Sequence, residues 1–136
     1  MLERFISTYG MLFMFFIFLL TGVILMGMIN QWYMIQDQAQ FIARSEGIYG
    51  GYTTDTASSV KQFLQEINQP DATIEVSAPN SPVAWGTPVW ATISVPFKFQ
   101  LGSVATLKTS LPITGVGRSI SACLPGEFSN VVYCSP

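Results

Sequence analysis

The feature that most limits what this chain can fold into is a long uncharged run near its N-terminus. Residues 5–36 carry no charged side chain, and within them residues 11–29 read MLFMFFIFLLTGVILMGMI. About 20 mostly apolar residues are needed to cross the hydrocarbon core of a bilayer as a helix. This segment has that length and leaves no polar face for water. It predicts a helix that spans a membrane, or one that becomes buried against other apolar helices in a polymer.

A cleaved secretory signal fits this segment less well. The apolar stretch of such a signal is about 7–15 residues long and ends in a small-x-small cleavage site. Here the stretch is longer, and residues 30–34 offer no such site. Trp32 and Tyr33 instead follow the stretch, where an interfacial aromatic belt would lie.

The helical pattern continues beyond the apolar run. Residues 31–45 contain no Gly or Pro and consist largely of good helix formers. Ile35, Ala39 and Ile42 recur at steps of four and three, which places them on one face of a helix. We expect a single helix from about Leu2 to about Glu46, roughly 65 Å long, which the glycines that follow interrupt: Gly47, Gly50 and Gly51.

This pattern divides the chain into two parts. Residues 1–49 form the N-terminal helix, with a transmembrane or filament-core half at 11–29 and an amphipathic half at 30–49. Residues 50–136 form a small extracellular domain that docks on the amphipathic half. The fold class predicted is α+β, in which a long N-terminal helix carries a short second helix and a small antiparallel sheet.

The elements of the domain follow from local patterns. Thr53-Thr54-Asp55 predicts the N-cap of the second helix, which ends before Pro70. Its apolar residues recur at steps of three and four: Ala57, Val60, Phe63, Leu64 and Ile67. Beyond it, alternation with period two predicts a strand around residues 74–76, a long strand over 89–99, a turn at 101–103, a partner strand over 105–113 and a last short strand over 118–122.

Two prolines restrict where the predicted strands can lie in the sheet. Pro96 and Pro112 each fall inside a predicted strand. Because proline cannot donate to the ladder, these strands should lie at an edge of the sheet or leave the ladder at those positions.

The composition argues against catalysis, metal binding and nucleic-acid binding. The chain has no histidine, which removes the commonest general base and metal ligand. Gly115-Val116-Gly117-Arg118 is too short for a dinucleotide-binding loop. The six Lys and Arg residues are scattered in a chain of net charge −2, whereas phosphate binding needs concentrated positive charge. We predict no enzyme, no cofactor and no contact with nucleic acid.

The two cysteines, Cys123 and Cys134, lie close to the C-terminus. In an oxidising compartment they would form a disulfide that closes the tail, and a loop this short would contribute about 3 kcal/mol. The alternative is two unpaired thiols. Arg4 and Arg44 give little orientation signal, so the expected disulfide favours an inside N-terminus and an outside domain.

Two groups of residues in the helix are candidates for contacts between subunits. Glu3 and Arg4 precede the apolar run. Glu3 either rests in the headgroup region or enters a helix bundle, where a neighbour's α-amino group or Arg4 would have to pair it. The residues expected to pack helices together in a filament core are Phe13, Phe16, Leu20, Gly22, Ile24 and Gly27.

This arrangement resembles that of type IV pilins, and more narrowly of the TadE-like and related pilin-like proteins of Gram-positive bacteria. The resemblance is carried by the apolar helix running into Ala43-Arg44-Ser45-Glu46-Gly47-Ile48-Tyr49, by the extended segments 89–99 and 107–113, and by Gly117-Arg118-Ser119 before the tail. It covers most of the chain in pattern, with short motifs.

The resemblance implies a structural role. The chain would be a subunit of an extracellular, type IV pilus-like helical filament on the cell surface, with a membrane-inserted precursor pool. Its partners would be copies of itself, the membrane before assembly, and a pilus assembly machinery. The alternative is a single-pass anchored module that stays in the membrane and presents its sheet to a partner.

Overall fold

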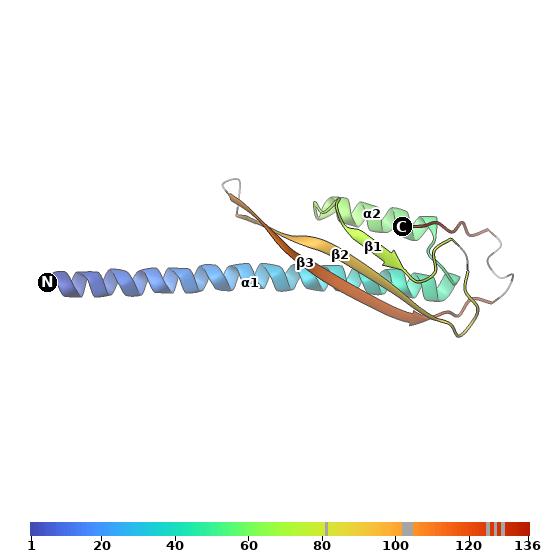
Figure 1. Cartoon of the computed structure of the whole chain (residues 1–136), viewed down its shortest axis with the longest axis horizontal. Coiled ribbons are helices and arrows are strands. Elements are labelled where there is room, and N and C mark those ends of the chain that lie inside the picture. Colours follow the sequence, from blue (N-terminus) through green and yellow to red (C-terminus); the bar gives the residue numbers. More distant parts are fainter. Residues whose placement is uncertain (81, 102–104, 125, 127, 129) are drawn as a thin grey trace.

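A computed structural model describes residues 1–80, 82–101, 105–124, 126, 128 and 130–136. Two helices are followed by three strands: α1 (Leu2–Tyr49), α2 (Thr54–Glu66), β1 (Thr73–Val76), β2 (Pro88–Leu101) and β3 (Ala105–Ile120). Figure 1 shows α1 projecting far beyond the rest of the chain, which gathers around its C-terminal half. The predicted α+β fold, with its long helix, short helix and small antiparallel sheet, is confirmed.

The long helix ends at residue 49, the predicted limit of the N-terminal segment, and passes Glu46, beyond which the glycines were expected to interrupt it. Gly47 does not interrupt α1, which continues to Tyr49 and ends at Gly50, whose φ of 79° is left-handed. Gly47 instead lies where β3 crosses the helix, because a Cβ at this position would collide with the side chain of Ser119. This glycine therefore permits close packing, and Gly50 ends the helix in the way that glycines commonly do.

The second helix begins and ends as expected. Thr53 is the N-cap, and its hydroxyl accepts a hydrogen bond from the backbone N–H of Thr56 at 3.2 Å. Val60 and Leu64 turn inward to the core. Ala57, Phe63 and Ile67 pack against it in part.

The sheet has the order β1-β2-β3, and both pairs are antiparallel. The short final strand predicted at 118–122 is not a separate element. Residues 118–120 are the end of β3, because β2 is long enough to pair with it as far as Pro88 opposite Ile120. The predicted turn at 101–103 lies largely outside the described residues.

The prolines lie where the sheet loses a neighbour, as predicted. β1 ends with Thr73 opposite Ser94, so β2 has no strand on that side beyond Ser94. Pro96 stands opposite Pro112, and the register is irregular between Pro96 and Lys98. Pro112 belongs to β3, which is the edge strand.

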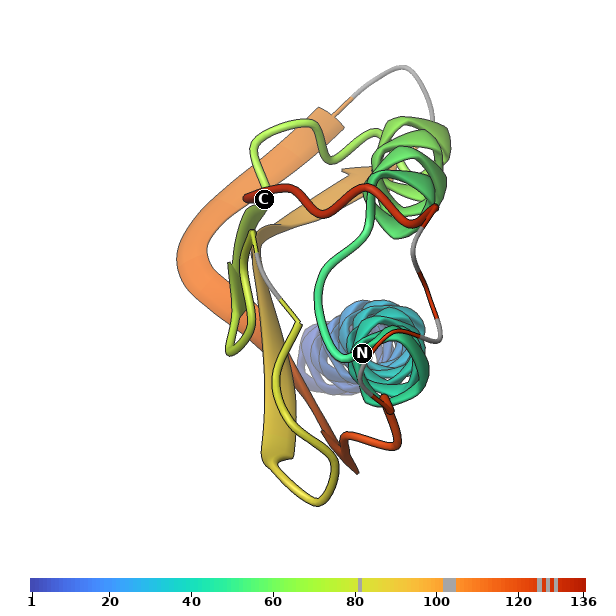
Figure 2. The same cartoon turned by 90° about the vertical axis from the view of Figure 1, so that its right-hand side faces the viewer.

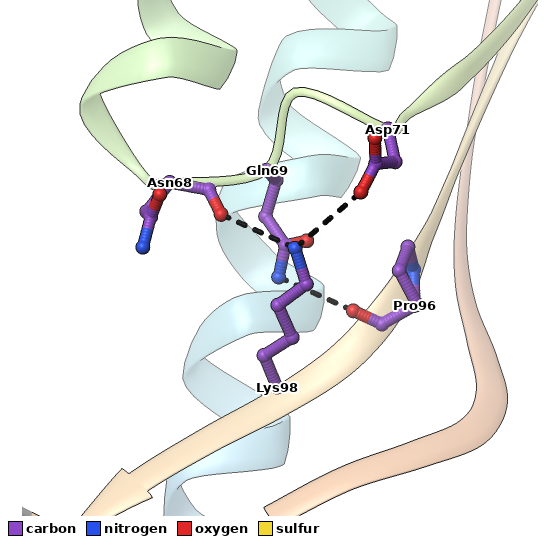
Figure 3. Close-up of polar contacts among 5 residues, drawn as sticks. All are labelled: Asn68, Gln69, Asp71, Pro96 and Lys98. Atoms are coloured by element: carbon purple, nitrogen blue, oxygen red, sulfur yellow. Dashed lines mark hydrogen bonds and ion pairs between the residues drawn. The ribbon is translucent and has the colours of Figure 1, made fainter. Parts of the chain in front are cut away.

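Side chains from the turn after α2 cover this open stretch of β2 (Figure 3). The amide nitrogen of Gln69 donates to the carbonyl of Pro96 at 3.2 Å. Lys98 Nζ lies 3.9 Å from Asp71 Oδ2 and 3.5 Å from the carbonyl of Asn68. On the helix side, Gln31 donates to the carbonyl of Lys98 at 2.9 Å. The carbonyls of Pro96 and Lys98 thus find donors where β1 no longer pairs with β2.

The core lies between one face of the sheet and one stripe of α1. Figure 2 shows α1 nearly end-on, with the sheet along one side and α2 nearby. The sheet contributes alternate residues of β2, as the period-two pattern predicted: Val89, Ala91, Ile93, Val95 and Phe97. The helix contributes the predicted stripe of Ile35, Ala39 and Ile42, together with Ala43.

Two glycines bring β3 directly onto the backbone of α1. A Cβ at Gly115 would lie 2.6 Å from the carbonyl oxygen of Ile35, and one at Gly117 would lie closer still to the carbonyl of Ala39. Between them, the side chain of Gln36 makes two hydrogen bonds with the backbone of Val116. Its Nε2 donates to the carbonyl at 2.8 Å, and its Oε1 accepts from the N–H at 3.0 Å. We call this contact the α1–β3 seam.

Because the α1–β3 seam is so close, we expect one added methyl group there to lower the stability of the folded chain substantially. Gly117→Ala should destabilise the protein by at least about 2 kcal/mol, because the backbones of two rigid elements would have to separate. The measurement is urea unfolding of the full chain in detergent, followed by tryptophan fluorescence. Gly10→Ala, where no atom lies within 4 Å of the added Cβ, is the matched control and should unfold like the parent protein. Equal stability of the two variants would contradict the close approach.

Candidate functional site: the exposed half of the long helix

The first 23 residues of the chain, nearly half of α1, are exposed over their whole length. We call residues 2–23 the bare segment. The most apolar 18-residue window of α1 has a mean hydropathy of 2.7 and none of it is buried. At 1.5 Å per residue the bare segment is about 33 Å long, close to the thickness of a bilayer's hydrocarbon core. α1 is therefore long and apolar enough to cross a membrane.

The residues predicted to pack helices together fall into two groups. Phe13, Phe16 and Leu20 are exposed, and their spacing of three and four places them on one side of the bare segment. Gly22 is also exposed, and an added Cβ there would meet nothing within 4 Å. These four positions are open to a neighbour.

Ile24 and Gly27 have a different environment. Ile24 packs in part against the core of the domain, as does Met28, and Gly27 is half-buried. Met28 lines a surface hollow together with Pro112 and Ile113 of β3. The sheet thus reaches down into the helical half that the sequence assigned to the membrane or the filament core. Pro112 and Ile113, which fall within the strand predicted over residues 105–113, make this contact.

Glu3 and Arg4 lie in the first turn of α1, and both are exposed. In the described residues the ion pair within 4 Å is Lys98 with Asp71, and it involves neither of them. A carboxylate in the first turn interacts favourably with the helix dipole. Both side chains are placed to meet a headgroup or a neighbouring chain.

At its other end, α1 makes hydrogen bonds with three other parts of the domain. Within the segment 43–49, Ser45 bonds to Thr56 of α2 at 2.5 Å, and the carbonyl of Tyr49 accepts from the hydroxyl of Tyr133 at 2.8 Å. The carbonyl of Gly47 accepts from the N–H of Ala122 at 2.7 Å. This segment therefore ties α2, the residues that follow β3 and the C-terminal tail to one helix.

A buried carboxyl lies within this same segment of α1, residues 43–49. Glu46 is fully buried, and Ser77 donates to its Oε2 at 3.2 Å, while its Oε1 has no partner among the described groups. Burial raises the pKa of Glu46 to about 7, against opposing hydrogen bonds from Ser77 and from the backbone of Ala78. Glu46 was not among the residues predicted from the sequence to form a site. The signal was present, since position 46 continues the buried stripe of Ile35, Ala39 and Ile42 by one further step.

The disulfide expected from the sequence is not formed in the structure. Cys123 and Cys134 are both free cysteines. Cys123 is buried against Gly50, where an added Cβ would lie 3.1 Å from its sulfur. Cys134 donates its N–H to the carbonyl of Tyr52 at 3.0 Å, and burial raises the pKa of its thiol. The pairing of Cys123 with Cys134 stays a prediction.

The described residues contain no group of three or more His, Cys, Asp or Glu side chains that could hold a metal ion. What the exposed helix offers is a long apolar surface with a charged first turn. Comparison of the chain with protein-family models, curated proteins and solved structures found no match.

The buried carboxyl predicts how stability depends on pH. The pKa of Glu46 is about 7 in the folded chain against a reference of 4.5, so the folded state binds more protons between these values. The contribution of Glu46 to the free energy of unfolding is fully present below pH 4.5. It is lost as pH rises towards 7, by up to about 3 kcal/mol.

Glu46→Gln should make the free energy of unfolding less dependent on pH, because the amide does not titrate. The measurement is urea unfolding at a series of pH values, with the exposed Glu75→Gln as a control that keeps the slope. A wild-type protein that gains stability between pH 5 and 7 would contradict the assignment.

Proposed function

We propose that this chain is a structural subunit of an extracellular, type IV pilus-like filament, assembled by packing of the N-terminal helices. The observation that carries the proposal is the continuity of α1. One helix of 48 residues is bare over its first half and forms the spine of the domain over its second half. At 1.5 Å per residue it is about 70 Å long.

The bare segment has to be covered by something other than its own domain. In water, the fifteen large apolar side chains exposed on this segment would drive aggregation. Before assembly, lipid would surround the bare segment and form its first cover. Equivalent helices of other copies supply a second, after extraction from the membrane.

The two covers are similar in apolarity, so transfer from lipid to a helix bundle brings little hydrophobic gain. Association of such helices depends on close packing, which small residues favour. Gly22 provides an open position of this kind on the bare segment. Glu3 and Arg4 would pair with charged groups of neighbouring subunits. Extraction from the membrane would require an assembly machinery that consumes energy.

The other candidate is a single-pass module that stays in the membrane and binds a partner through its domain. The same apolar window fits this role. The continuity of α1 favours the filament, because a lone anchor does not need a rigid extension into the domain.

The deciding experiment is electron microscopy of the fraction sheared from the surface of cells that express the full chain, labelled with antibody against residues 50–136. Labelled thin fibres would support the filament subunit. Label confined to the membrane fraction, with no fibres, would overturn it in favour of the anchored module.

A size series at Gly22 tests the packing of the bare segment. Gly22→Leu should lower the yield of surface filaments about tenfold or more, since a large side chain holds helices apart. Its membrane insertion should be unchanged, because nothing in the subunit itself lies within 4 Å of the added Cβ. Gly22→Ala is the matched control and should assemble almost normally. Normal filament yield from Gly22→Leu would refute the packing argument.

A further inference from the structure

A small cleft lies between α1, the turn after α2 and β2. Its volume is about 270 Å³, and none of the described residues that line it is charged. Apolar side chains form much of its wall, and two glutamine amides contribute to it. The residues concerned are Met34, Ile35, Ile67 and Val95 for the apolar wall, and Gln31 and Gln69 for the amides.

Both amides are held in one orientation by hydrogen bonds. Nε2 of Gln31 donates to the carbonyl of Lys98 at 2.9 Å. Nε2 of Gln69 donates to the carbonyl of Pro96 at 3.2 Å (Figure 3). An amide turned the other way would set its oxygen against a carbonyl oxygen, and both atoms are acceptors. These two bonds therefore fix which end of each amide is the oxygen.

The two amide oxygens are buried and have no donor. Gln69 is 2% exposed, and neither its Oε1 nor Oε1 of Gln31 has a hydrogen-bond partner among the described groups. A buried acceptor without a donor is costly. Two such acceptors on side chains that line one cleft indicate a ligand that donates at least two hydrogen bonds.

The position of the cleft along α1 is that of a membrane surface. The apolar run ends at Ile29, and the cleft begins at the next residue, Asn30. Trp32 and Tyr33, in the same turn, are 43% and 63% exposed, and such aromatic side chains favour the headgroup layer. This layer adds roughly 5–7 Å to each side of the hydrocarbon core. In a membrane-inserted chain, the cleft is thus at the depth of lipid headgroups.

We propose that the cleft binds the headgroup of a membrane lipid through a primary ammonium group, as in phosphatidylethanolamine. An ammonium has three N–H donors and no acceptor. It therefore satisfies Oε1 of Gln31 and Oε1 of Gln69 together. The short carbon chain of the headgroup packs against the apolar wall, and the phosphate stays in water at the open side.

The surroundings of the cleft are compatible with a positive charge. Ile67 lines the cleft and is the C-cap of α2, so the carbonyl end of this helix borders the site and its dipole favours a cation. Lys98 belongs to the same set of contacts (Figure 3), and Asp71, 3.9 Å from its Nζ, offsets its charge. The phosphate of the lipid brings a second negative charge, so no isolated cation is buried.

A methylation series of one lipid tests the number of donors. The full chain in detergent is offered phosphatidylethanolamine, its N-methyl and N,N-dimethyl forms, and phosphatidylcholine, all with the same acyl chains. Bound lipid is measured by native mass spectrometry. The charges are equal along the series, whereas the N–H donors fall from three to none. Retention should fall about tenfold once fewer than two donors remain, between the monomethyl and dimethyl forms. Equal retention of all four lipids would overturn the proposal.

Two substitutions separate hydrogen bonding from size, because each added methyl group also enlarges the headgroup. The same series is measured on a chain with Gln31→Met and Gln69→Met, which keeps the length of both side chains and removes both oxygens. This double variant should lose the preference for phosphatidylethanolamine. Gln65→Met, at an exposed position of α2, is the matched control and should keep it. A preference that survives in the folded double variant would contradict the site, and the series on the unaltered chain tests the proposal even if this variant does not fold.

Phosphatidylglycerol tests the identity of the donor. Its headgroup offers two hydroxyls in place of the ammonium, and we expect about tenfold weaker retention, because hydrogen bonds from a charged donor are stronger. Retention equal to that of phosphatidylethanolamine would assign the oxygens to hydroxyl donors and overturn the ammonium. The inference goes beyond the proposed filament, since a filament precursor and a permanent anchor would share the site. Absence of fibres leaves the lipid site standing, and loss of the lipid preference leaves the filament standing.

Discussion

The contact of β3 with the backbone of α1 is the constraint on which the rest of the structure depends. Gly115 and Gly117 let the strand lie directly on the helix, and Gln36 occupies the free edge of the strand with two hydrogen bonds. β2 is held in turn by its long pairing with β3, and β1 by β2. The sheet is therefore organised outward from the helix. A strand of larger residues at 115 and 117 could not occupy this position.

The sequence predicted the elements well where a repeating pattern ran uninterrupted. The helix, the N-cap at Thr53 and the alternation of β2 are all properties of local sequence. The prediction failed where a glycine serves a distant contact. Gly47 reads as the end of a helix, and Gly115 and Gly117 read as a break between strands, because local pattern does not reveal that another backbone passes there. The continuity of β3 and the passage of α1 through Gly47 were missed for this one reason.

The residues of the candidate site divide in the same way, into those that a local pattern reveals and those whose setting depends on the fold. The exposed apolar surface, with Phe13, Phe16 and Leu20, was visible as a run of residue types without any knowledge of the fold. Ile24 was assigned to the same surface, but the sheet reaches it. Glu46 was overlooked because a glutamate in an amphipathic helix is normally taken for a solvent-exposed residue, and its burial depends on β1 and the loop that follows it. A sequence pattern identifies which residue types form a surface, whereas the extent of that surface depends on tertiary contacts.

The absence of any hinge in α1 has a mechanical consequence. Helix and domain are joined along a line of contacts parallel to the helix axis, from Met28 to Gly47. Tension applied along the axis would load these contacts in shear, so that they would have to fail together and not one after another. In a fibre built from such subunits, force would pass from core to surface through a single stiff element.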